Sequence, residues 1–90
     1  MDKEKQIINM LNCSEKLVGS KQVLKGLSEG IIRCVFIAED TESELKAKLV
    51  AAAVSKNAEV FTAPSMEWLG KQAGIEVRAA TVGLTAVLED

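Results

Sequence analysis

The chain has 90 residues, of which 48% are hydrophobic and 27% charged, with a formal net charge of −2 at pH 7. This composition suits one small domain with a packed core, over residues 1–90, and excludes a disordered chain. No apolar run approaches the ~18 residues that span a bilayer, and the mixed charges of residues 1–5 do not form a signal peptide, so we expect a cytoplasmic protein with no membrane partner.

The first predicted elements are a helix, a very short strand and a second helix. Apolar residues at near-helical spacing predict the helix over residues 6–11, and residues 17–18 form the strand that leads into Gly19. Ser20 is predicted to be the N-cap of the second helix, because its hydroxyl can accept a hydrogen bond from an unpaired backbone N–H. An inward apolar stripe leaves three hydrogen-bonding side chains on the outer face: Lys21, Gln22 and Lys25.

The middle of the chain alternates strands and helices. Residues 34–38 are continuously apolar, as in a central strand that is covered on both faces. A helix then runs to about residue 56, with Thr41 and Glu44 at capping-box spacing near its start. Residues 58–62 form the next strand.

The last predicted elements are one helix and one strand. Pro64-Ser65 starts the helix, which covers residues 66–73 and is closed by Gly74. The strand occupies residues 79–88, where Gly83 marks a weak point or a bulge.

The alternation of elements predicts the α/β class, as a three-layer α/β/α sandwich with a four-stranded mixed sheet. Ligands bind such sheets at the edge where strands lead into helices. The Gly19 turn, residues 39–40 and the segment just before Ser65 lie at strand ends. Residues 75–78 lead from a helix into a strand, so they share that edge only if the last strand is antiparallel.

The residues that carry most enzyme chemistry are missing. The chain has no histidine and no tyrosine, and its six serines have no evident catalytic partner, so we expect neither enzyme activity nor a small-molecule substrate. The scattered glycines match no cofactor motif, and we expect no cofactor. Cys13 and Cys34 lack CxxC spacing, which favours two buried thiols over a zinc site. The acidic residues from Glu39 to Glu44 suit a solvated helix start better than a metal site.

The charges are unevenly distributed along the chain. Residues 39–44 contain four acidic residues and no basic one. Residues 14–33 contain four basic residues against two acidic ones, and the basic ones are Lys16, Lys21, Lys25 and Arg33. Such segregation can leave one face attractive to phosphate although the net charge is negative. We interpret the helix start after Gly19 as an RNA-reading surface with Lys16 and Arg33 extending its basic footprint; an ordinary capped helix with solvated lysines is the alternative.

Four segments, in this order, resemble the L-seven-Ae / L-thirty-e family of ribosomal and ribonucleoprotein proteins, and in particular its small bacterial members. They are Gly19-Ser20-Lys21-Gln22-Val23-Leu24-Lys25, Ala38-Glu39-Asp40, Ser65-Met66-Glu67-Trp68-Leu69-Gly70-Lys71 and Gly74-Ile75-Glu76-Val77. The resemblance, which runs from about residue 17 to residue 84, implies an α/β/α sandwich that binds kink-turn RNA. This RNA is a sharply bent duplex with a bulge beside tandem sheared G·A pairs. Ribosomal RNA and association with the ribosome are part of the same expectation.

The resemblance also implies roles for individual residues. The family's Gly-x-Asn-Glu-x-x-Lys signature falls on four positions that would read guanine edges and hold the RNA backbone: Gly19, Lys21, Gln22 and Lys25. Glu39 would lie near the flipped-out bulge base, and a loop that packs on the bulge comprises Ile75, Glu76 and Val77. Ser20 and Arg33 complete the predicted RNA-binding set.

The chain departs from the family pattern at two places. Lys21-Gln22 replaces Asn-Glu; lysine can donate to guanine O6 and N7, and glutamine carries both a donor and an acceptor. Met66 stands where many members carry a lysine. These departures and the negative net charge keep an alternative open, in which the chain is a protein–protein adaptor on the same fold. We expect a monomer, with Trp68 in the core rather than exposed as a contact residue.

Overall fold

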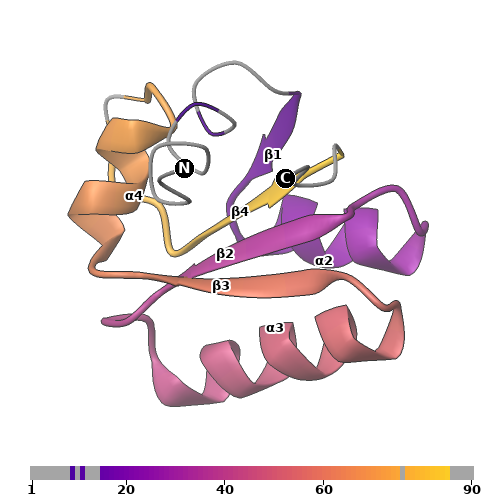
Figure 1. Ribbon diagram of the computed structural model, residues 1–90. Helices are drawn as coiled ribbons and strands as arrows, with labels where there is room; N and C mark the ends of the chain where they lie inside the picture. The colour runs from indigo at the N-terminus through magenta and orange to yellow at the C-terminus, as the bar shows by residue number, and fades with distance from the viewer. Residues whose placement is uncertain (1–8, 10, 12–14, 76, 86–90) are drawn as a thin grey trace, which may run out of the picture.

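The structure is a computed structural model, which describes residues 9, 11, 15–75 and 77–85. Within them, strands and helices alternate (Figure 1) in the order β1 (Lys16–Val18), α2 (Ser20–Ser28), β2 (Cys34–Ala38), α3 (Ser43–Ser55), β3 (Glu59–Ala63), α4 (Met66–Gln72) and β4 (Thr81–Leu84). Asn9 and Leu11 are helical. The rest of the helix predicted over residues 6–11 lies outside the described residues, as do Cys13, Glu76 and residues 86–88 of the predicted last strand.

The described strands form one mixed sheet in the order β1-β4-β2-β3. β2 and β3 are parallel, whereas β4 runs antiparallel to both β1 and β2. β1, β2 and β3 therefore all end at the same edge of the sheet, and β4 begins there. In Figure 1, β2 and β3 run toward the left of the view, where β4 starts. The predicted four-stranded mixed sheet is confirmed.

Helices cover both faces of the sheet and form the predicted three-layer sandwich (Figure 1). α2 and α3 pack against each other on one face, where the buried residues are Val23, Leu27, Ile32, Val35, Ile37, Leu49, Ala53 and Ala58. α4 covers the other face, where the buried residues are Leu11, Cys34, Phe36, Ala38, Ala63, Leu69, Ala73, Ala79, Val82 and Leu84.

β2 contributes to both cores because alternate side chains of a strand point to opposite faces. Val35 and Ile37 face α2 and α3, whereas Cys34, Phe36 and Ala38 face α4. All five residues are buried, which explains the continuous apolar run in the sequence. The prediction of a central strand, with a buried thiol at Cys34, is confirmed.

Two of the predicted helix caps are wrong. α2 begins at Ser20, so its N-cap is Gly19, which has φ 96° and gives no side-chain cap. The N-cap of α3 is Glu42, again without a side-chain cap hydrogen bond. The Thr41 hydroxyl instead donates to the carbonyl oxygen of Ala80 at 3.1 Å. Capping-box spacing is a local signal, whereas here the hydroxyl forms its hydrogen bond with a carbonyl group that is distant in the sequence.

Gly83 marks no bulge, which corrects the other local prediction for β4. It pairs in regular register with Leu17 on one side and Val35 on the other. A Cβ at this position would lie 2.6 Å from Cδ1 of Ile32. The small residue therefore makes room for a core side chain, and the strand stays regular.

α4 starts as predicted. The Ser65 hydroxyl oxygen accepts a hydrogen bond from the Trp68 N–H at 3.0 Å, and Gly74 follows the helix with φ 76°. Trp68 is half-buried and packs against the core on this face of the sheet, so its predicted packing role is confirmed. None of the described helices is long and apolar enough to cross a membrane.

Candidate nucleic-acid interface

Four connecting segments meet where β1, β2 and β3 end and β4 begins. They are the Gly19 turn, residues 39–42, residues 64–65 and the described residues from 73 to 80, which leave out Glu76. We call the surface that they form the strand-end edge. The sequence predicts residues 75–78 on this edge only if the last strand is antiparallel. β4 is antiparallel to its neighbours, so the condition is met.

Backbone hydrogen bonds join these segments to one another. The bonds run from Gly19 N–H to Thr81 O (3.1 Å), from Ala38 N–H to Ala80 O (2.9 Å) and from Glu39 N–H to Ala63 O (2.8 Å). Each bond links segments that are far apart in the sequence. The strand-end edge is therefore built as one surface, because each segment is held by a neighbour as well as by its own strand.

The start of α2 presents open backbone N–H groups beside basic side chains. The N–H groups of a first helical turn have no partner within the helix, and no side chain caps them here. Lys21, Gln22 and Lys25 are exposed, whereas Val23 is buried. Among the three described helices, only α2 lacks an acidic residue in its first turn. The partial positive charge of this helix start is therefore available to phosphate.

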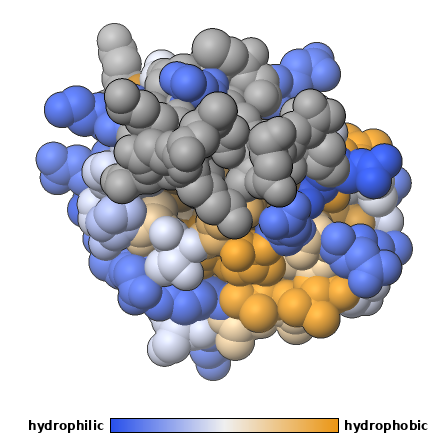
Figure 2. Space-filling model, in the orientation of Figure 1, coloured by the Kyte–Doolittle hydropathy of each residue, from blue (hydrophilic) through white to orange (hydrophobic). Residues whose placement is uncertain are grey.

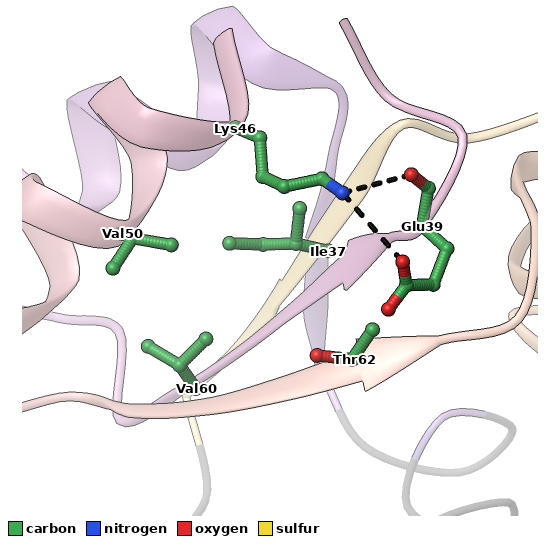
Figure 3. A pocket seen from close by; sticks show the side chains of 6 residues that line it. All are labelled: Ile37, Glu39, Lys46, Val50, Val60 and Thr62. Carbon is green, nitrogen blue, oxygen red and sulfur yellow. Dashed lines mark hydrogen bonds and ion pairs between the residues drawn. The ribbon is translucent and has the colours of Figure 1, made fainter. Parts of the chain in front are cut away.

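Glu39 lies on the strand-end edge, but its carboxylate is turned toward α3. Lys46 Nζ donates to the backbone carbonyl oxygen of Glu39 at 2.8 Å and lies 3.7 Å from its Oε2. Figure 3 shows Lys46 reaching across a small hollow of about 80 Å³ that apolar side chains also line. An exposed ion pair of this kind contributes little to stability, so Glu39 can exchange it for a donor on a ligand.

The loop at residues 75–78 combines an anchored and an exposed apolar side chain. Ile75 packs against the core on the α4 face, whereas Val77 is 70% exposed. An open hollow of about 270 Å³ lies between this loop and α4, and it is lined by Glu67, Lys71, Ile75, Val77 and Arg78. The hollow thus combines apolar surface with two basic side chains and one acidic side chain.

Gly70 allows this loop to lie close to α4. A Cβ at position 70 would collide with the carbonyl oxygen of Val77 and lie 3.2 Å from Cα of Arg78. The loop is tied to α4 on both sides of this contact, by hydrogen bonds from Ile75 N–H to Gly70 O (3.0 Å) and from Ala79 N–H to Met66 O (3.1 Å). The position of Val77 therefore depends on the absence of a side chain at Gly70.

Arg33 does not share the strand-end edge. It precedes β2, where its N–H donates to Leu84 O and its carbonyl oxygen accepts from Glu59 N–H. This is the opposite edge of the sheet, about 17 Å away along a five-residue strand. Lys16 begins β1 and lies at that opposite edge too. The structure thus brings together Gly19, Ser20, Lys21, Gln22, Glu39, Ile75 and Val77 on one edge, with Lys25 one turn further along α2.

An exposed apolar area adjoins the hollow beside Glu39, which Val50 and Val60 also line (Figure 3). Figure 2 shows it over α3 and β3, right of centre in the view, and its exposed large side chains are Val50, Val54 and Val60. The side chains of Val50, Val54 and Val60 carry no donor for phosphate, so they are not part of the candidate RNA surface.

Thr81→Val is expected to lower the free energy of unfolding by about 1 kcal/mol. The buried Thr81 hydroxyl donates to Phe36 O at 2.7 Å, and valine keeps the shape of the side chain without the donor. Urea denaturation compares this variant with Thr62→Val, a control at an exposed position of β3. Equal midpoints for the two variants would contradict the assigned hydrogen bond.

Three residues that shape the strand-end edge are not among the predicted RNA-binding residues: Asp40, Gly70 and Thr41, of which only Thr41 has a predicted role, as a helix cap. The partners of Asp40 and Thr41 are backbone atoms of other segments, which no local pattern reveals. Gly70 does leave a signal, because a glycine inside a predicted helix costs about 1 kcal/mol relative to alanine and so indicates a close approach.

Nearly the whole chain matches a known protein family. Residues 4–89 match the Ribosomal protein L7Ae/L30e/S12e/Gadd45 family. The chain belongs to this family, and the resemblance seen in the four sequence segments is confirmed.

Individual relatives agree with this assignment. The chain is 39% identical over 71 residues to an RNA-binding protein of Halalkalibacterium halodurans, which covers 79% of this chain and 87% of the relative. It is 36% identical over 84 residues to an RNA-binding protein of Staphylococcus aureus, with 93% and 98% covered. The solved structure of the Giardia lamblia 15.5kD RNA binding protein superposes with a TM-score of 0.82 at 18% identity, over 97% of this chain and 77% of that chain. At that identity the superposition shows a shared fold.

Proposed function

We propose that this chain is a non-enzymatic RNA-binding protein that recognises kink-turn RNA and stabilises its bent form. The observation that carries the proposal is the uncapped start of α2, where open N–H groups, Lys21 and Gln22 stand on the same edge as the loop at residues 75–78. The family of the chain and the RNA-binding names of its relatives support RNA as the partner.

The start of α2 supplies the groups that read bases. Lys21 can donate to guanine O6 and N7, and Gln22 offers a donor and an acceptor to the edges of the sheared pairs. Lys25 lies one turn after Lys21 and would bind phosphate without reading sequence. Nothing lies within 4 Å of the point where a Cβ of Gly19 would be, so the RNA backbone can approach Gly19 and Ser20 closely.

The loop at residues 75–78 would receive the bulge. The exposed Val77 offers apolar surface to an unstacked base, and we propose that Glu39 and Glu76 contact the bulge as well. Met66 supplies no positive charge where many family members carry a lysine. In this chain Lys71 and Arg78, which line the hollow next to Val77, would supply that charge.

We propose that only a bent RNA contacts both surfaces at once. A ligand shifts a conformational equilibrium only by its difference in affinity for the two states, and a straight duplex would reach one surface and not the other. Binding therefore selects the kinked conformation. One strand-end edge holds all the proposed contacts, so we propose that a monomer binds one kink-turn, without a cofactor.

A titration tests the proposal directly. The protein is titrated against a labelled kink-turn duplex and against the same duplex with its G·A pairs changed to Watson–Crick pairs. We expect tighter binding to the kink-turn at every salt concentration, and affinity for both RNAs that falls as salt rises. Equal, weak binding to the two RNAs would overturn the proposal.

A second candidate function is a protein–protein adaptor on the same fold. The exposed apolar area of Val50, Val54 and Val60 favours it, since such areas often mark contact with a partner. The same titration separates the two functions, because an adaptor that has lost RNA affinity would not discriminate between the duplexes.

The cellular setting is also part of the proposal. The family includes ribosomal proteins, which supports a structured RNA such as ribosomal RNA, in the cytoplasm, as the target. Cosedimentation of the protein with ribosomes in a sucrose gradient tests the ribosomal partner, and its absence from ribosomal fractions would point to another kink-turn RNA.

A further inference from the structure

The turn at residues 39–42 lies between the two halves of the proposed RNA surface. It follows β2 and leads into α3. Two of its side chains bond to segments that belong to neither of these elements: Asp40, which is exposed, and Thr41, which is only 7% exposed.

Asp40 caps α4 although it lies 26 residues before it in the sequence. Its Oδ1 accepts a hydrogen bond from the Met66 N–H at 2.8 Å, which is one of the first-turn N–H groups that have no partner within the helix. Ser65 caps the same helix from its own segment, through the Trp68 N–H. The start of α4 thus has two caps, and only that of Asp40 fixes the helix relative to β2.

Thr41 holds the segment that leads into β4. Its hydroxyl donates to Ala80 O at 3.1 Å, and the same oxygen accepts from Ala38 N–H at 2.9 Å. The neighbouring Ala79 N–H donates to Met66 O at 3.1 Å. The segment after the 75–78 loop is therefore held on one side by the turn and on the other by α4.

These hydrogen bonds connect the two halves of the strand-end edge. Gly19, at the start of α2, donates to Thr81 O at 3.1 Å, next to the residue that Thr41 holds. Asp40 completes the connection by accepting a hydrogen bond from the start of α4. Backbone hydrogen bonds in turn join α4 to both ends of the 75–78 loop. The turn thus fixes the position of the 75–78 loop relative to the start of α2.

We propose that Asp40 and Thr41 are positioning residues for RNA binding, which place α4 and the 75–78 loop at the distance from the α2 start that a bent RNA requires. This inference rests on the proposed function. It also gives a reason for an acidic residue on an edge proposed to bind phosphate. Asp40 acts through the hydrogen bond that it accepts from the Met66 N–H, and its negative charge does not contribute to RNA binding.

Conservative variants separate this role from a direct effect of charge. Asp40→Asn keeps an oxygen that accepts from the Met66 N–H but removes the charge, whereas Asp40→Ala removes both. We expect Asp40→Asn to bind kink-turn RNA as tightly as the wild type or slightly more tightly. Asp40→Ala should lose about tenfold in affinity for the kink-turn and little for the Watson–Crick control. Equal behaviour of the two variants would overturn the positioning role in favour of charge.

Thr41 provides an independent pair of variants. Thr41→Ser retains the hydroxyl that donates to Ala80 O, and Thr41→Val removes it while keeping the volume. Only Thr41→Val should lose kink-turn affinity, by roughly fivefold to tenfold. A loss of the same size in Thr41→Ser would contradict the assigned hydrogen bond.

Amide hydrogen exchange of the free protein tests the positions without RNA. In Asp40→Ala, exchange at the Met66 and Ala79 N–H groups should accelerate about tenfold, and the emission of Trp68, the single tryptophan of the chain, should shift. Glu42→Ala is the matched control, because Glu42 is an exposed acid of the same turn that gives α3 no side-chain cap. It should leave both signals unchanged.

The two measurements distinguish the possible failures. Unchanged exchange in Asp40→Ala overturns the positioning role, whatever the RNA affinities are. Accelerated exchange with undiminished kink-turn affinity shows that the turn holds α4 but does not serve RNA binding, which also overturns it. Equal binding of the wild-type protein to both RNAs overturns the proposed function itself, and the inference falls with it.

Discussion

Replacing Gln22 by alanine is expected to remove most of the preference for kink-turn RNA over the Watson–Crick control duplex. Gln22 is exposed in the first turn of α2, where its amide can pair with a base edge at the sheared G·A pairs. A good two-bond contact to a base gives about 1–3 kcal/mol of discrimination, or roughly 5-fold to 150-fold in the ratio of affinities. Fluorescence anisotropy titrations with both RNAs, at one salt concentration, measure that ratio.

Lys25→Ala is the matched control on the same face of α2. A phosphate contact carries no sequence information, so both affinities should fall together while their ratio stays constant. The slope of log K against log salt should become shallower by about 1. Gln22→Glu restores the family's carboxylate, which accepts more strongly from guanine N–H groups, and should preserve discrimination. An unchanged ratio of affinities in Gln22→Ala would remove the α2 start from the reading surface.

Much of the fold could be predicted because its signals are local and strong. The unbroken apolar run of β2 indicates a strand buried on both faces, and Ser65 before a short helix is a cap that the structure retains. The direction of β4 could not be predicted, since the sequence of a short apolar strand does not specify which neighbour it pairs with. That direction brings the 75–78 loop to the same edge as Gly19.

Two of the errors arise where a distant group decides the local structure. Thr41 and Glu44 have the spacing of a capping box, but the Thr41 hydroxyl bonds to Ala80, 39 residues further along the chain. Gly83 resembles a weak point of a strand and is instead required by the volume of Ile32. Each of these outcomes depends on tertiary packing, which single-sequence patterns do not contain.

The candidate site shows the same contrast between local signals, which could be predicted, and tertiary contacts, which could not. Residues within one helix start, Lys21, Gln22 and Lys25, could be grouped from their spacing alone. Arg33 was grouped with them by charge and by closeness in the sequence, but one five-residue strand separates it from their edge. Charge counts along a chain locate a basic segment, and only strand direction tells which end of the sheet each charge occupies.

Gly70→Ala is expected to displace the 75–78 loop and to weaken binding of kink-turn RNA by about tenfold or more. Helix propensity alone predicts the opposite sign for stability, because alanine is favoured over glycine inside a helix by about 1 kcal/mol. At position 70 the added Cβ collides with the Val77 carbonyl oxygen, a backbone atom that cannot rotate away. The loop must therefore move, and we expect a net loss of about 1–3 kcal/mol in the free energy of unfolding.

Gly26→Ala is the control that separates loss of stability from loss of the RNA surface. The three heavy atoms nearest to a Cβ at Gly26 all belong to side chains, and the closest are the Cδ1 atoms of Ile32 and Leu17 at 2.6 Å. Both side chains belong to the core between α2 and the sheet. Gly26→Ala can therefore destabilise the protein while the 75–78 loop stays in place. At a temperature where both variants are folded, only Gly70→Ala should lose kink-turn affinity and show altered amide signals for Ile75 and Val77. Equal losses of RNA affinity in the two variants would mean that the position of this loop does not control binding.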